Sequence, residues 1–135
     1  MSRTEWARRH VVRTLRSQAI ACPEKYRLML DRTSDGEFIR DLKPWIFLPY
    51  PEHTAGYCAE ILSQPVLPFA QAIGEDLIAC FQYAPVDNPG VIVLNPWSRS
   101  KRLVRRAELP SYDIWLSYAF HVARAVKARA QPVPA

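Results

Sequence analysis

Residues 77–94, LIACFQYAPVDNPGVIVL, contain two apolar runs with a turn signal between them. The first run, 77–83, places apolar side chains on both faces of an extended chain, and the second run, 91–94, does the same. Strands of this kind normally lie in the interior of a sheet that helices cover. Because the connection is short and contains Asn88-Pro89-Gly90, the two runs predict an antiparallel hairpin. The fold is therefore expected to be built around a mainly antiparallel sheet.

The segment after this hairpin predicts a charged strand and then a long helix. Residues 103–107 read as a third strand that carries too much charge to lie centrally. Ser111 is a good N-cap residue, and Asp113 falls in the first helical turn, where a negative charge is favourable. The helix should reach about Arg129, with Trp115 in the core. Its expected apolar stripe consists of Ile114, Trp115, Tyr118, Val122 and Val126.

Two helices are expected before the sheet. Residues 4–21 place Val11, Val12, Leu15 and Ala19 at spacings of three and four, which is typical of one helix face. Arg9, Arg13 and Arg16 lie on an adjacent strip, which is either a solvated border of that face or a basic docking surface. Pro23-Glu24 suits the start of a second helix. Its apolar side would consist of Tyr26, Leu28, Met29 and Leu30.

Four shorter features complete the pattern. Residues 34–36, Ser-Asp-Gly, are a turn signal. Residues 45–48 form a short buried run closed by Pro49-Tyr50-Pro51. Residues 53–62 predict a helix, although Gly56 is unfavourable within it. The tail, 131–135, holds two prolines and is expected to be frayed.

Length and composition indicate one globular domain spanning residues 1–135, with its core at about 23–130. The chain is 49% apolar and 23% charged, which is close to the globular average. The fold class that follows is α+β: a single domain whose central, mainly antiparallel sheet is packed by the N-terminal and C-terminal helices. Eighteen Lys and Arg against 13 Asp and Glu give a net charge of +5. This balance favours nucleic acid, an anionic membrane or an acidic protein surface as a partner.

The cysteines and the apolar runs bear on location. Cys22, Cys58 and Cys80 share no metal-type or redox-type spacing, so we expect three reduced thiols in a cytoplasmic protein. Residues 19–22, AIAC, faintly resemble a lipoprotein cleavage box. The residues before it include Arg13, Arg16 and Gln18, which exclude the apolar segment that a signal peptide needs. Proline interrupts every long uncharged run, which argues against a transmembrane helix.

The sequence offers no convincing catalytic, metal or cofactor site. His53 and Cys58 would lie near each other on a helix, but two ligands do not define a metal centre. Glu75 and Asp76 are adjacent, so on an extended chain they point to opposite faces and suit a turn better than an acid–base pair. No Gly-x-Ser-x-Gly elbow or Gly-rich phosphate loop is present. The expectation is therefore a protein that is not an enzyme and needs no cofactor.

The densest run of positive charge is the candidate partner-binding site. It consists of Trp97, Arg99, Lys101, Arg102, Arg105 and Arg106. Cations beside an aromatic ring can hold phosphates and stack on bases. The alternative structural role is an edge strand that positive charge protects from pairing with another chain. A third possibility is an acidic protein partner, for which such charges raise the association rate.

The order of these elements resembles that of the SUKH superfamily, which includes yeast cell-wall regulators and bacterial immunity proteins of polymorphic toxin systems. The family's proline followed by a Tyr-containing helix is similar to 23–30, PEKYRLML. Its proline-apolar-alanine entry to the sheet resembles 67–70, LPFA, and its Gly-Asp turn resembles 74–77, GEDL, with Glu75 inserted. The second strand resembles 90–94, GVIVL, and the start of the last helix resembles 111–116, SYDIWL. The Asn-Gly-Gly turn of the family has only a weaker equivalent at 35–37, DGE.

The resemblance implies an immunity-type protein that binds and neutralises a cognate bacterial toxin by occluding a surface the toxin needs. It implies no catalytic residues. Known bacterial relatives are often acidic, whereas this chain is basic. This departure leaves two alternatives: a toxin with an acidic contact surface, or a member of the family that is not an immunity protein. A small basic nucleic-acid-binding or regulatory protein is the alternative expectation, and no membrane partner is expected.

Overall fold

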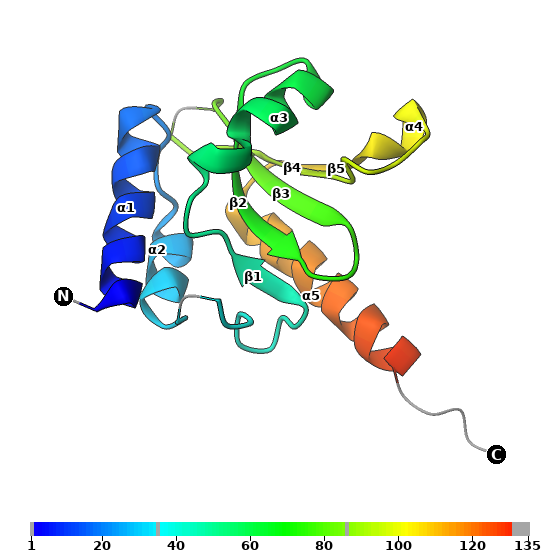
Figure 1. Ribbon diagram of the computed structural model, residues 1–135, viewed down its shortest axis with the longest axis horizontal. Helices are drawn as coiled ribbons and strands as arrows, with labels where there is room; N and C mark the ends of the chain where they lie inside the picture. The colour runs from blue at the N-terminus through cyan, green and yellow to red at the C-terminus, as the bar shows by residue number, and fades with distance from the viewer. Residues whose placement is uncertain (1, 35, 86, 131–135) are drawn as a thin grey trace.

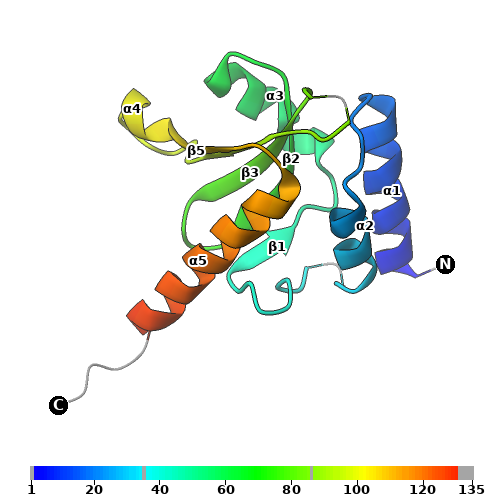
Figure 2. The same cartoon turned by 180° about the vertical axis from the view of Figure 1, so that it is seen from behind.

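Five strands form one sheet in the computed structural model, which describes residues 2–34, 36–85 and 87–130. The strands are β1 (Trp45–Phe47), β2 (Val66–Ala72), β3 (Leu77–Gln82), β4 (Val91–Leu94) and β5 (Arg105–Leu109). They lie in the order β1-β2-β3-β4-β5, and each neighbouring pair is antiparallel. Figures 1 and 2 show the sheet with α1 (Arg3–Ser17) and α2 (Glu24–Asp31) at one end and α4 (Lys101–Val104) at the other. The α+β architecture agrees with the expectation from the sequence.

The predicted hairpin is the centre of this sheet. β3 pairs with β4 in the register Ile78↔Leu94 to Phe81↔Val91. β2, which the sequence pattern marked only as an entry to the sheet, pairs along the other side of β3. A register shift between Pro68 and Ala70 lets the strand continue past a proline, which cannot donate a backbone hydrogen bond.

The third strand was predicted two residues too early. Residues 103 and 104 belong to the single helical turn α4, and β5 begins only at Arg105. The backbone N–H of Leu103 donates to the carbonyl of Ser100 (3.0 Å), which closes the turn instead of extending a strand. β5 pairs with β4 alone, so its position at the edge of the sheet agrees with its charge.

The last helix, α5 (Tyr112–Ala130), begins where the sequence predicts. The backbone N–H of Ile114 donates to the hydroxyl of Ser111 (3.2 Å), as expected for an N-cap. The predicted apolar stripe is wrong at Ile114, which is 47% exposed. The buried stripe is instead Tyr112, Trp115, Ala119 and Ala123. It is rotated toward Tyr112 because that ring packs against the aromatic core of the sheet.

The N-terminal helices differ from the prediction at two positions. α1 ends at Ser17 and not at residue 21, because Ala19 adopts a left-handed conformation (φ 57°) that turns Ile20 into the core. The N–H of Ile20 donates back to the carbonyl of Leu15 (2.9 Å) and satisfies the helix end. In α2, Tyr26 and Leu30 are buried as expected, but Leu28 is 46% exposed and does not belong to the apolar side.

Helices cover both faces of the sheet. On one face, α1, α2 and α5 enclose an aromatic core that includes Tyr26, Trp45, Phe69, Phe81, Tyr112 and Trp115. On the other, α3 (Glu52–Leu62) covers a smaller cluster that includes Cys58, Ile78, Cys80 and Ile92. Alternate residues of β3 and β4 face the two clusters, which explains why both strands are apolar on both sides.

Two more of the predicted segments are elements of the fold. The buried run at 45–48 is β1 and the predicted helix at 53–62 is α3. The turn at 34–36 includes Asp35, which lies outside the described residues, as does the tail 131–135. Among the described helices, none is both long and apolar enough to cross a membrane.

Candidate binding surfaces

The sequence-predicted site lies on a projection formed by the end of β4, α4 and the start of β5. Figures 1 and 2 show this projection extending away from the rest of the molecule. We use the name tip for its residues 97–104. Trp97 is 54% exposed and Leu103 is 53% exposed. Arg99 and Arg102 are exposed in the same short segment, and the side chain of Lys101 lies outside the described part of the structure.

The backbone of the tip is held by local hydrogen bonds. The N–H of Trp97 donates to the Oδ1 atom of Asn95 (3.0 Å), and the N–H of Ser98 donates to the carbonyl of Asn95 (3.2 Å). The N–H of Asn95 donates in turn to the carbonyl of Val104 (2.7 Å), which ties the start of the tip to its end. A loop closed in this way holds the backbone of Trp97 in place, which lowers the ordering cost of binding through its exposed indole.

Arg105 and Arg106, the last residues of the predicted site, point to opposite faces of β5. Arg105 forms an ion pair with Glu108, and its Nη2 atom donates to the carbonyl of Leu62 in α3 (3.3 Å). Arg106 lies near Tyr118 of α5: burial raises the pKa of Tyr118, and the charge of Arg106 opposes that rise. The sequence-predicted cluster is therefore divided, and Arg105 is engaged within its own chain.

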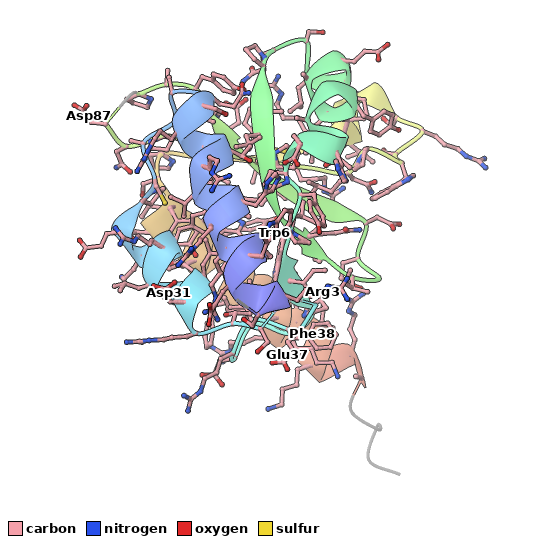
Figure 3. The ribbon with its side chains drawn as sticks, turned by 60° about the vertical axis from the view of Figure 1, so that its left-hand side comes forward. Arg3, Trp6, Asp31, Glu37, Phe38 and Asp87 are labelled. Atoms are coloured by element: carbon pink, nitrogen blue, oxygen red, sulfur yellow. The ribbon has the colours of Figure 1, made fainter. Side chains whose placement is uncertain are left out.

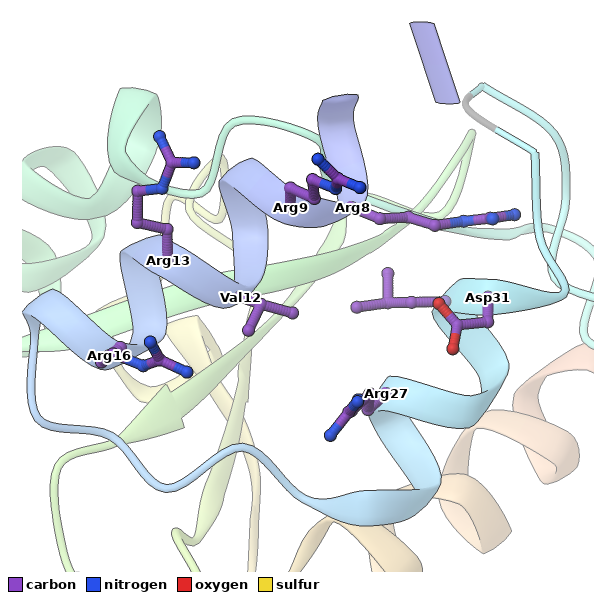
Figure 4. A pocket seen from close by; sticks show the side chains of 8 residues that line it. Arg8, Arg9, Val12, Arg13, Arg16, Arg27 and Asp31 are labelled. Atoms are coloured by element: carbon purple, nitrogen blue, oxygen red, sulfur yellow. The ribbon is translucent and has the colours of Figure 1, made fainter. Parts of the chain in front are cut away.

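A second basic surface lies between α1 and α2. Five arginines line a pocket of about 400 Å³ there, with Val12 and Leu30 as its apolar residues. Figure 4 shows the side chains around this pocket. We call it the arginine groove, and its arginines are Arg8, Arg9, Arg13, Arg16 and Arg27.

The arginine groove holds little compensating charge. Asp31 is the one acidic residue that lines it. Within the described part of the chain, the ion pairs involve none of its five arginines. Arg8 is nevertheless tethered, because its Nη2 atom donates to the carbonyl of Thr33 (3.3 Å). The sequence showed the strip of Arg9, Arg13 and Arg16, but it gave no sign that Arg27 faces them from α2.

The groove continues into a neighbouring pocket of about 410 Å³ that shares Val12, Arg16 and Arg27. Ile20, Cys22 and Glu24 line this continuation. Burial raises the pKa of the Cys22 thiol, and the nearby Arg27 guanidinium opposes that rise. The thiol is therefore held in its neutral form. Glu24 lines the same pocket, but among the described residues Arg27 forms no ion pair with it.

Two histidines that are far apart in sequence share one aromatic cluster. His10 stacks on Trp6 (ring centroids 5.2 Å apart), and His53 stacks on Tyr50 (4.9 Å). The rings of His10 and Tyr50 also approach each other (5.5 Å), which joins α1 to the start of α3. In Figure 3, Trp6 and Asp31 lie on opposite sides of α1, so this cluster is separate from the arginine groove.

A carboxylate completes the cluster. The Oε1 atom of Glu52 lies 2.5 Å from the Nε2 atom of His10. Partial burial opposes ionisation of Glu52, but its backbone hydrogen bond and the two histidines outweigh burial and lower its pKa. His53 contributes to this cluster, whereas Cys58 is buried on the side of α3 that faces the sheet, where it contacts Cys80. The two residues that the sequence raised as a possible ligand pair thus have different neighbours.

The three cysteines are free, as the sequence indicates. Cys58 and Cys80 face each other between α3 and β3. A hydrogen bond between the thiols lowers the pKa of Cys58, whereas burial raises that of Cys80 well above its ordinary value. Glu75 and Asp76 occupy the turn between β2 and β3, where Glu75 pairs with Arg129 and Asp76 takes a left-handed conformation. This agrees with the predicted turn role.

Comparisons with known proteins add no relative to this description. The chain matches no family model, and neither the curated proteins nor the solved structures give a significant match. Among the described residues, no group of three or more His, Cys, Asp and Glu side chains could hold a metal ion. The two basic surfaces are therefore the features from which a function is argued.

Proposed function

We propose that this protein is a non-enzymatic, immunity-type protein that binds and neutralises a cognate bacterial toxin, and that the tip carries the contact. The observation that supports the proposal is the exposure of Trp97 and Leu103, each more than half accessible, on a projecting segment beside Arg99 and Arg102. Trp and Arg are the residue types most enriched at the energetic centre of protein interfaces. The resemblance of the chain to the SUKH superfamily supplies the partner class.

The mechanism is occlusion of a toxin surface. Trp97 would enter an apolar pocket of the toxin and supply most of the affinity, with Leu103 packing beside it. Arg99 and Arg102 would lie at the rim, where positive charge speeds association with an acidic surface. Arg105 has a positioning role, since it already binds Glu108 and α3 within its own chain. We place this action in the cytoplasm, a reducing compartment that suits three free thiols.

The test first looks for a toxin domain encoded beside the gene for this protein and then uses that domain as the binding partner. We expect the two chains to co-purify and the protein to restore growth when the toxin is expressed. Trp97→Ala should weaken binding at least tenfold, as loss of an interface anchor does. Trp6→Ala is the matched control, because Trp6 is exposed to a similar extent (48%) but lies on α1, away from the tip. Failure of both co-purification and rescue would exclude the adjacent toxin as the partner.

Nucleic-acid binding is the second candidate, since an exposed indole beside arginines could also stack on a base. A salt titration separates the two functions. Binding driven by phosphate contacts weakens steeply as salt rises, with a slope set by the number of contacts. If labelled single-stranded and duplex oligonucleotides do not bind at low salt, this candidate is excluded.

A further inference from the structure

We propose that the arginine groove is a separate binding site for a short, extended, acidic segment of a polypeptide. The proposal does not depend on the toxin-binding function, because the tip and the α1–α2 pair lie at opposite ends of the molecule (Figures 1 and 2). Four features of the groove support it: its charge, the distribution of that charge, its apolar lining and its two ends.

The arginines of the groove carry positive charge that no ion pair among the described residues compensates. Arg9, Arg13 and Arg16 are spaced by four and three residues, so neighbours repel along one face of α1. Arg27 adds a fourth charge from α2 across the pocket. Within the described residues no ion pair relieves this repulsion. A ligand with several carboxylates would relieve it and would gain paired guanidinium–carboxylate hydrogen bonds.

The positive charge is spread along the groove. Arg9 and Arg16 are seven residues apart, which corresponds to about 10 Å along the helix axis. In Figure 4 the labelled guanidinium groups point in different directions and do not converge on one point. A single compact anion could reach one or two of them. An extended ligand with several charges could reach all of them.

Aliphatic side chains line the groove between the arginines. Val12 and Leu30 line the first pocket, and Ile20 lines its continuation. Among the described residues that line the two pockets, none is aromatic. Single-stranded nucleic acid is normally held by stacking of its bases on aromatic rings, which these two pockets do not offer. Aliphatic side chains between arginines suit an acidic polypeptide better, because its backbone and methylene groups can pack on them.

The two ends of the groove set the length of the ligand. Asp31 lies at one end of the groove and Glu24 at the other, and each would repel a carboxylate. These residues are the two ends of α2, seven residues and therefore about 10 Å apart. An extended chain covers that distance with about three residues. The groove should thus select three or four residues that contain at least two carboxylates, such as Glu-Leu-Glu.

The experiment measures binding of a labelled peptide to the full-length protein. The probe is a fluorescein-labelled Gly-Ser peptide with a central Glu-Leu-Glu-Glu, and its partner carries Gln-Leu-Gln-Gln. We expect the acidic peptide to bind in low salt and the glutamine peptide to bind at least tenfold more weakly. Arg13→Gln with Arg16→Gln should weaken the acidic peptide about tenfold, the effect of losing two exposed ion pairs.

The control variant carries Arg102→Gln and Arg106→Gln, which removes the same charge from the other end of the molecule. We expect it to change peptide affinity less than twofold. Arg27→Gln is the second groove variant; it acts from α2 and remains informative if the double variant in α1 does not fold. Circular dichroism establishes that each variant used retains its fold.

Three results would overturn the proposal. One is an equal loss of affinity in the groove and control variants, which would mean that only net charge matters. Another is the absence of peptide binding at millimolar concentration in low salt. The third is a duplex or single-stranded oligonucleotide that displaces the peptide and binds more tightly, with the same sensitivity to Arg27→Gln, because the groove would then be a nucleic-acid site. Toxin binding through the tip is unaffected by any of these results, so the two proposals fail separately.

Discussion

Replacing Tyr26 by phenylalanine should stabilise the protein. Tyr26 is fully buried, and its ring packs edge-on against Phe47, Phe69 and Phe81 at centroid distances of 5.3, 5.6 and 5.2 Å. Its hydroxyl group is also buried, and it has no hydrogen-bond partner among the described residues. The ring is therefore favourable where it lies, whereas the hydroxyl was taken from water without compensation.

The expected gain follows from two opposing effects. An unpaired buried hydroxyl costs about 1–3 kcal/mol relative to its hydrated state. Its removal leaves a cavity of about one oxygen atom, which at about 24 cal/mol per Å³ costs only a few tenths of a kcal/mol. Tyr26→Phe should thus raise the free energy of unfolding by about 1 kcal/mol, equivalent to about 4 °C in Tm for a chain of this size.

Urea unfolding followed by circular dichroism measures this change. Tyr112→Phe is the matched control, because Tyr112 is equally buried but its hydroxyl donates to the Sδ atom of Met29 (3.3 Å). The control should be neutral or slightly destabilising. If Tyr26→Phe instead lowered stability by 1 kcal/mol or more, the hydroxyl would have to be bonded in solution, for example to a buried water molecule, and the reasoning would be refuted.

The same substitution should reduce the sensitivity of the fold to alkali. Burial raises the pKa of Tyr26 well above its ordinary value of 10, with Tyr112 and Cys22 acting in the same direction. Because the folded-state pKa is the higher one, ionisation of this tyrosine does not affect stability below pH 10, whereas above pH 10 the hydroxyl ionises first in the unfolded chain and the folded state loses stability. The stability advantage of Tyr26→Phe should therefore widen as the pH rises above 10.

Three further predictions concern other parts of the fold. Trp115→Ala should cost about 3–5 kcal/mol in urea unfolding, since it removes a fully buried indole that packs on the aromatic core. Glu52→Gln should lower stability by less than 1 kcal/mol at pH 7, because the carboxylate is partly exposed. Its pKa is lowered in the folded state, so that contribution is present above the ordinary value of 4.5; the difference from wild type should shrink as the pH falls below 4.5 and disappear below the lowered folded-state pKa. Reaction with a thiol reagent should label the partly exposed Cys22 in the native protein, and label Cys58 and Cys80 only after unfolding.

The parts of the fold that could be predicted are those that local pattern determines. The β3–β4 hairpin follows from two runs that are apolar on both faces with a proline–glycine turn between them. The start of α5 follows from Ser111, whose hydroxyl accepts the expected backbone hydrogen bond. In both cases the residues that fix the structure are neighbours in sequence, so tertiary contacts are not needed to interpret them.

The errors occur where tertiary packing overrides local preference. Periodicity alone placed Ile114 on the buried face of α5, but the packing of Tyr112 on the sheet rotates that face. Ala19 would extend α1 by its own propensity, yet it adopts a left-handed conformation so that Ile20 can reach the core. β2 was not predicted as a full strand because it contains Pro68, and a proline within a strand is normally unfavourable. Only the register shift beside Pro68 allows it in this strand.

The basic surfaces show the same limit for function. The run from Trp97 to Arg106 is dense in sequence, yet an alternating strand sends Arg105 and Arg106 to opposite faces and leaves fewer cations at the tip than the count suggests. The arginine groove is the reverse case: Arg27 joins the arginines of α1 only because α2 packs beside that helix. The density of cations along the sequence therefore overestimates the positive charge at the tip and gives no sign of the arginine groove. A positive patch is defined by the faces that its side chains share, and those faces are known only once the helices and strands have been placed.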